Sequence, residues 1–148
     1  MKGILYTFDE LSLGMSASLS RTVTRGDITR FAEVTGDHNP IHVDEEFVRE
    51  FCLGKKPLGQ NIAHGMFGAG ILSAVLGTKL PGPGGVYMEQ TLSFKKPVFI
   101  GDTITGKVEI VNLNREKYHI RLSTVCVNQD ETVVIDGFAL LYFRIARI

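Results

Sequence analysis

The sequence has little cysteine, no excess of either charge and no long apolar run. Only two of its 148 residues are cysteine, Cys52 and Cys126, and neither has a second ligand at metal-binding spacing. This excludes a disulfide-dense scaffold and indicates reduced thiols in a cytoplasmic protein. The chain has 16 basic residues (Lys plus Arg) and 16 acidic residues (Asp plus Glu). It therefore has no net positive charge that would attract it to nucleic acid or to an acidic membrane. We therefore expect a small or local partner.

The chain also lacks the segments that would take it into or across a bilayer. Its least polar stretch, residues 62–76, contains His64, Ser73 and several glycines. That stretch is shorter than the roughly 20 apolar residues of a membrane span. The N-terminus reaches Asp9 and Glu10 too early to form a signal-peptide core. Without repeats or low-complexity tracts, residues 1–148 are expected to form a single soluble domain in the cytoplasm.

The first half of the chain predicts helices. Thr24 has the features of an N-cap, with Asp27 three residues later, and Gly36 would end that helix. A second, short helix is expected to begin at Asp44. Residues 55–60 are expected to form a loop, because glycine and proline interrupt this stretch. From about residue 64 to 79 the side chains are apolar or small nearly all the way round. This pattern is typical of a helix buried on every side.

The second half predicts strands. Alternating or apolar runs, bounded by turn residues, are expected at residues 17–23, 86–96, 103–114, 117–128 and 132–145. An antiparallel sheet of about five strands curved around the buried helix is the most economical α+β arrangement. Long strands with a free edge favour edge-to-edge pairing, so we expect a homodimer with a continued sheet, and a higher oligomer stays open.

One segment, residues 35–42, is dense in reactive side chains. Gly36 and Pro40 both oppose continuation of the helix, so Asp37 and His42 are expected on a loop. A carboxylate and an imidazole directed to one point suit the addition or removal of water, which needs one proton taken and one given. The ordinary alternative is a turn aspartate and a structural histidine. A metal site at Asp37, His38 and His42 is not expected, because Pro40 breaks the helical spacing and no further ligand is visible.

A second feature lies at residues 64–66, where the buried helix begins. The backbone N–H of Gly65 would be one of the unpaired donors of the first turn. A glycine at a helix N-terminus permits close approach and favours an oxyanion that develops during a reaction. The alternative is a glycine required only for close packing.

These segments together resemble a known family. Residues Phe31, Val34, Thr35, Gly36 and Asp37, followed by Asn39 to His42, resemble the hydratase-2 signature of the MaoC-like, (R)-specific enoyl-CoA hydratases. His64-Gly65-Met66 and residues 92–102 resemble further segments of that family, so the resemblance extends over most of the chain. It implies a hot-dog fold, which agrees with the sheet wrapped around a helix.

The resemblance also implies roles for particular residues. Asp37 and His42 match the pair that holds the catalytic water, Asn39 matches a residue that supports their loop, and Gly65 matches the glycine whose N–H polarises the thioester carbonyl. The implied reaction converts trans-2-enoyl-CoA to (R)-3-hydroxyacyl-CoA, with coenzyme A as part of the substrate and without a metal or other cofactor. The sequence departs from the pattern at Val48, in a longer stretch between residues 44 and 64, and at Gln60-Asn61, where Arg-Pro is common.

Several further contacts follow as expectations. His42 would take the proton from water and Asp37 would deliver one to C2, although the two roles could be exchanged. The substrate is expected beside His64 and Met66, with its acyl chain past Ala69, Ser73 and Leu76. Coenzyme A phosphates need cations, and the lysines considered for them are Lys55, Lys56, Lys79 and, with preference, Lys95 and Lys96. Alternative functions are dehydration of an acyl-carrier-protein or branched-diacid thioester, and non-catalytic binding of acyl thioesters.

Overall fold

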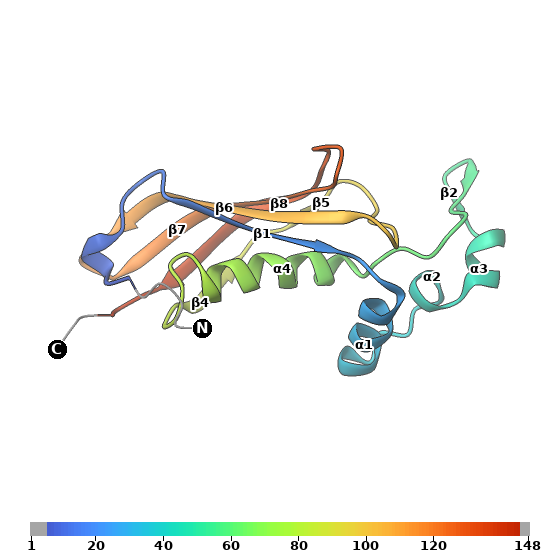
Figure 1. Cartoon of the computed structure of the whole chain (residues 1–148), viewed down its shortest axis with the longest axis horizontal. Helices are drawn as coiled ribbons and strands as arrows, with labels where there is room; N and C mark the ends of the chain where they lie inside the picture. Colours follow the sequence, from blue (N-terminus) through green and yellow to red (C-terminus); the bar gives the residue numbers. More distant parts are fainter. Residues whose placement is uncertain (1–5, 146–148) are drawn as a thin grey trace.

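The computed structural model describes residues 6–145, except for the side chains of Cys52 and Leu53 (Figure 1). Residues 1–5, which begin the stretch tested above for a signal peptide, lie outside this range. The expectation of a reduced thiol at Cys52 also lies outside it, whereas Cys126 is buried as a free thiol. Among the described residues, no helix has both the length and the apolar character required to cross a bilayer.

An antiparallel sheet forms the body of the molecule, which confirms the expected α+β class. Its strands lie in the order β1, β6, β7, β8 and β4, and β5 also pairs with β8. Their bounds are Ser16–Thr22 for β1, Val86–Gln90 for β4, Ser93–Phe94 for β5, Thr103–Asn114 for β6, His119–Val127 for β7 and Val133–Tyr142 for β8. The run expected as one strand over 86–96 is thus divided into two. A register shift between Tyr87 and Glu89 further breaks its two-residue alternation.

The helix α4, Gly65–Thr78, lies against one face of this sheet (Figure 1). Its buried face packs into a core with the inward side chains of the strands, including Ile104, Val108, Ile120, Leu122 and Ile135. Burying each aliphatic side chain contributes roughly 1.5–3 kcal/mol. Gly68 permits the close approach, because a Cβ added there would lie 2.5 Å from Cδ1 of Ile135.

The prediction that α4 is buried on every side is wrong for the single chain. Met66 is 57% exposed, and Gly70, Ser73 and Gly77 are also exposed. One sheet covers only one side of a helix, so the apolar and small residues on the other side are left open to solvent. The sequence alone could not distinguish burial within one chain from burial against a second body.

Three short helices and a small hairpin lie beyond the N-terminal end of α4 (Figure 1). They are α1 (Arg25–Thr35), α2 (Pro40–Val43), α3 (Glu45–Glu50) and the hairpin of β2 (Cys52–Leu53) with β3 (Lys56–Pro57); a 3-10 turn, η1, covers Phe8–Glu10. Thr24 and Asp27 form the expected capping box, and Gly36 ends α1 in the left-handed region at φ 77°.

Two local expectations about this region are corrected. Pro40 begins α2, because the first position of a helix needs no N–H donor and already has the φ that proline imposes. The segment expected as a loop from residue 55 to 60 contributes Lys56–Pro57 to the hairpin.

Candidate active site

Three polar side chains from different elements meet where these short helices adjoin α4. Asp37 follows the end of α1, His42 lies on α2, and His64 is the N-cap residue of α4. Side-chain atoms of the three lie within 4.8 Å of one another. Asp37 is on a loop, as predicted. His42 is on a helix instead, because Pro40 begins α2. The meeting of Asp37 and His42 confirms that this segment directs both groups to one place.

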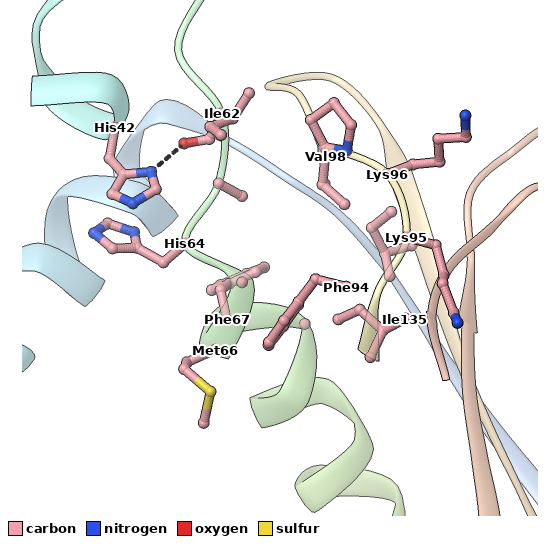
Figure 2. A pocket seen from close by; sticks show the side chains of 15 residues that line it. His42, Ile62, His64, Met66, Phe67, Phe94, Lys95, Lys96, Val98 and Ile135 are labelled. Carbon is pink, nitrogen blue, oxygen red and sulfur yellow. Dashed lines mark hydrogen bonds between the residues drawn. The ribbon is translucent and has the colours of Figure 1, made fainter. Parts of the chain in front are cut away.

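His42 is held in one orientation by a hydrogen bond, and its surroundings lower its pKa. Its side chain is 7% exposed, and Nδ1 lies 2.8 Å from the carbonyl oxygen of Ile62 (Figure 2). Because that carbonyl can only accept, Nδ1 carries the hydrogen, and in the neutral ring the lone pair is therefore on Nε2. Burial lowers the pKa of His42, the adjacent His64 lowers it further, and the Ile62 carbonyl and Asp37 oppose the shift. The arrangement favours a neutral imidazole with a free basic nitrogen.

His64 contacts both other members of the cluster. Its Nε2 donates to the backbone carbonyl of Asp37 at 2.9 Å, and its ring lies against that of His42 (Figure 2). Among the buried side-chain polar atoms of the described residues, its Nδ1 stands out as lacking a hydrogen-bond partner. The ring of Phe31 also contacts it, with centroids 4.8 Å apart. Sequence analysis placed His64 only near the substrate, because it lies twenty-two positions after His42 in the chain.

Asn39 organises the loop between α1 and α2. Its side-chain oxygen caps α2 by accepting from the N–H of Ile41 at 3.3 Å. Its own N–H donates to Oδ1 of Asp37 at 3.2 Å. Asn39 therefore supports the loop through local bonds and fixes the Asp37 carboxylate, which is the kind of role the sequence suggested.

A cavity of about 550 Å³ opens beside this cluster (Figure 2). It passes the start of α4 and reaches inward to Ile104 and Ile135, so most of its wall is apolar. Four residues expected near the substrate line it: His64, Met66, Lys95 and Lys96. Such a cavity suits an apolar chain joined to a polar group that faces the histidines.

Three further residues expected along the acyl chain do not line this cavity. Ala69 is half-buried and Ser73 is exposed, both on α4 beyond the lining residues. Leu76 is 1% exposed and packs into the core between α4 and the sheet. The helix phase used in the prediction could not show that the cavity turns inward at Gly68.

Gly65 is the first residue of α4 and lies at the wall of the cavity. Within residues 6–145 its backbone N–H is bonded to no acceptor, as expected for the first turn. The ring of Phe94 lies over it, because a Cβ added to Gly65 would be 2.7 Å from Cε1 of that ring. Phe94 is itself 53% exposed. Sequence analysis missed this contact, because it placed Phe94 only within the strand expected at residues 86–96.

Comparison with known proteins places this geometry in a family. The sequence matches the MaoC-like domain over residues 12–133. The chain belongs to the MaoC-like family. It is 47% identical over 138 residues to a 3-hydroxybutyryl-CoA dehydratase of Methylorubrum extorquens, covering 93% of this chain and 83% of that protein. It is 44% identical over 136 residues to an (R)-specific enoyl-CoA hydratase of Rhodospirillum rubrum, covering 92% of this chain and 90% of the relative.

Solved structures give the same result. An (R)-hydratase from Aeromonas caviae superposes with a TM-score of 0.84 at 34% identity, covering 90% of this chain and 98% of that one. The fold is therefore the hot-dog fold of MaoC-like proteins, as the sequence resemblance implied. The curated relatives are hydratases and dehydratases, and the protein is accordingly a hydro-lyase.

Cations are unevenly placed around this MaoC-like site. Lys95 and Lys96 lie at the cavity, and Nζ of Lys95 is 3.5 Å from a carboxylate oxygen of Asp136. Lys79 follows the opposite end of α4, where Nζ donates to the carbonyl of Ser18. The remaining two candidates, Lys55 and Lys56, are exposed on or beside the β2–β3 hairpin. Position therefore favours the two cavity lysines over Lys79 as anion contacts.

Asp37, His42 and His64 are also the described residues that could together hold a divalent cation. Each histidine uses its second nitrogen to contact a backbone carbonyl, as metal ligands often do. However, the two rings are stacked with only 31° between their planes, whereas zinc ligands converge from tetrahedral directions. The stacked rings therefore fit tetrahedral coordination poorly, and the absence of a metal stays a prediction.

Proposed function

We propose that this protein is an (R)-specific enoyl-CoA hydratase that adds water reversibly to trans-2-enoyl-CoA. The observation that carries the proposal is the buried His42 imidazole beside the Asp37 carboxylate at an apolar cavity. The relatives that act on 3-hydroxybutyryl-CoA and enoyl-CoA support coenzyme A as the carrier. The apolar cavity supports an aliphatic acyl group over a branched diacid.

In the proposed reaction, a water molecule lies between Asp37 and His42. Nε2 of His42 takes one proton as the water oxygen bonds to C3, and the C2–C3 double bond shifts its electrons toward the thioester oxygen. The Asp37 carboxylate accepts a hydrogen bond from the same water and stabilises the imidazolium by its charge. The proton on Nε2 then passes to C2, in place of the delivery by Asp37 expected from the sequence, so one hydroxyl and one proton have been added. General acid–base groups of this kind contribute typically 10²–10⁴-fold.

The enolate oxygen that forms in between is assigned to the free N–H of Gly65. A donor at a helix start costs no reorganisation when charge develops, and the partial positive charge of α4 adds to it. The Phe94 ring over Gly65 has to make room for the thioester carbonyl. Lys95 and Lys96 are proposed to contact the coenzyme A phosphates at the rim. No step uses a metal or another cofactor, so prolonged dialysis against EDTA is expected to leave the rate unchanged.

We also propose that the protein is a homodimer formed through β4. This strand ends the sheet, and three consecutive apolar side chains on it are exposed: Val86 at 57%, Tyr87 at 39% and Met88 at 52%. Pairing two such edges would satisfy their backbone groups and cover apolar surface, including the exposed side of α4. A cytoplasmic location stays a prediction.

The hydratase proposal is tested with crotonyl-CoA, whose conjugated double bond absorbs in the ultraviolet. Purified protein is expected to remove this absorbance, and an (R)-specific 3-hydroxyacyl-CoA dehydrogenase is expected to oxidise the product. An (S) product would contradict the proposal. Loss of absorbance only with acyl-carrier-protein thioesters would indicate the carrier-protein alternative. Tight binding of a panel of acyl thioesters without turnover would instead indicate a binding module.

A further inference from the structure

The carboxamide of Asn61 is buried against the C-terminal end of α2. Asn61 is 1% exposed, although it is polar. Its Nδ2 lies 3.2 Å from the carbonyl oxygen of Ile41, 3.0 Å from that of Asp44 and 3.4 Å from that of Pro40. These three carbonyls belong to α2 and its C-cap. One amide group therefore contacts three carbonyls at the end of this short helix, in addition to the bonds that the Pro40 carbonyl accepts from the N–H of Asp44 and the Ile41 carbonyl from a backbone N–H.

Arg25 determines which way round this carboxamide lies. Its Nη1 donates to Oδ1 of Asn61 at 2.8 Å. A guanidinium has donors only, so the amide oxygen has to face Arg25 and the amide nitrogen has to face the carbonyls. Arg25 also pairs with Glu45 in the first turn of α3. Asn61 thus ties α2 to the first residue of α1 and, through Arg25, to α3.

The helix that carries His42 depends on such outside bonds. α2 has four residues, far fewer than a helix needs to be stable alone. The residue after Asn61 adds two bonds: the N–H of Ile62 donates to the Ile41 carbonyl at 3.2 Å, and its carbonyl accepts from Nδ1 of His42. Asn61 and Ile62 therefore hold both the backbone of α2 and the imidazole ring that projects from it.

We propose that Asn61 is a positioning residue that, oriented by Arg25, clamps α2 so that the lone pair on Nε2 of His42 faces the substrate water. This inference rests on the proposed role of His42 as the base. The related sequence pattern commonly has proline at this position. A proline has no side-chain amide to donate to the three carbonyls, so the clamp belongs to sequences that carry Asn here.

The test compares three variants. Asn61→Asp keeps the shape and the acceptor for Arg25 but replaces the donating amide by an oxygen. Arg25→Met keeps the amide and removes the group that orients it. Asn128→Asp is the matched control, because Asn128 holds the turn after β7 by accepting from the N–H groups of Asp130 and Thr132 and does not line the cavity. Each protein is examined by ¹⁵N NMR of its imidazoles and by hydration kinetics.

The expected result is a change at His42 and in kcat. In wild type, Nδ1 of His42 carries the hydrogen; in Asn61→Asp that tautomer loses population, because the bond from Nδ1 to the Ile62 carbonyl is no longer held in place. The kcat should fall roughly 10- to 100-fold, as misplacement of a reacting group by about 1 Å can cause. KM should stay within about twofold, since no substrate contact is removed. Arg25→Met should show smaller changes in the same direction, and Asn128→Asp should match wild type.

Unchanged His42 signals and unchanged kcat in Asn61→Asp, even with a lower melting temperature, would overturn the inference and leave Asn61 a purely structural role. If that variant does not fold, Arg25→Met decides by the same two readouts. The His42 spectrum also reports on Asp37 and His64, which face the ring, so neither is altered in these proteins. A wild type that hydrates no enoyl thioester would overturn the proposed function, and the imidazole spectra would still decide whether the clamp operates.

Discussion

The imidazole ring of His64 lies on that of His42, with centroids 3.9 Å apart and 31° between their planes. The same residue donates from Nε2 to the backbone carbonyl of Asp37. One side chain therefore contacts both members of the proposed catalytic pair. Burial of the His42 ring lowers its pKa, and the proximity of His64 lowers it further.

Two substitutions of His64 separate its hydrogen bond from its bulk. His64→Gln places an amide nitrogen near the position of Nε2 and can still donate to Asp37, whereas His64→Leu fills the space without a donor. We expect His64→Leu to lower kcat/KM for crotonyl-CoA roughly 10- to 100-fold and His64→Gln to lower it less. Equal losses in the two variants would mean that the bond to the Asp37 carbonyl has no role in positioning the loop.

Gly65 allows its N–H to be removed without breaking α4. Proline is well tolerated at the first position of a helix, and His64 already has an extended backbone with ψ 134°. Gly65→Ala is the control, because it adds a Cβ against Phe94 but retains the N–H. We expect the alanine variant to lose activity by crowding, and Gly65→Pro to lose a further 10²–10³-fold in kcat, the usual cost of one oxyanion donor. Similar rates in both would refute the assignment.

The lowered pKa of His42 predicts a particular pH dependence. The base must be neutral, so the acid limb of kcat/KM should have its midpoint below about 6.5, the ordinary value for histidine. The unfolded chain binds a proton at this residue at a higher pH than the folded protein does. Stability should therefore rise with pH across that window and fall as the pH drops below about 6.5. A midpoint above 6.5, measured with crotonyl-CoA well below KM, would contradict the buried neutral base.

The exposed edge of β4 makes the oligomeric state testable. Met88→Lys places a charge on that edge, and Val111→Lys places one on β6, where Val111 is 41% exposed away from the edge. Light scattering should give wild type and Val111→Lys twice the mass of one chain and shift Met88→Lys toward the monomer. A monomeric wild type would refute the dimer, and a dimeric Met88→Lys would place the interface elsewhere.

Local chemistry explains how much of the fold could be predicted. The two ends of α1 are determined by residues close to each other in the chain: Thr24 with Asp27 at the start, and Gly36 with its left-handed φ at the end. Such local interactions produce recognisable sequence patterns. The strands β6, β7 and β8 could be predicted equally well from the alternation of apolar and polar residues along them. Pro40 misled the prediction because proline opposes a helix in its interior and favours one at its first position. The spacing of Gly36 and Pro40 did not distinguish these cases.

Contacts between distant residues explain the remainder of the site. Asp37 and His42 lie five positions apart, and their meeting could be expected from the segment itself. Three other features depend on how distant elements are placed relative to one another. They are the approach of His64 to both residues, the cover of Gly65 by Phe94 and the clamp by Asn61. Likewise, Leu76 packs into the core and does not line the cavity, which only the packing of α4 decides.

The most direct test of the account is the hydration rate of crotonyl-CoA for Asp37→Asn and His42→Gln, with His38→Gln as control. His38 is exposed in the same loop and lies outside the cluster. Both site variants should keep the wild-type melting transition within a few degrees and lose on the order of 10²–10⁴-fold in kcat. His38→Gln should retain the wild-type rate. Near-wild-type turnover by either folded site variant would contradict the claim that Asp37 and His42 together add the water.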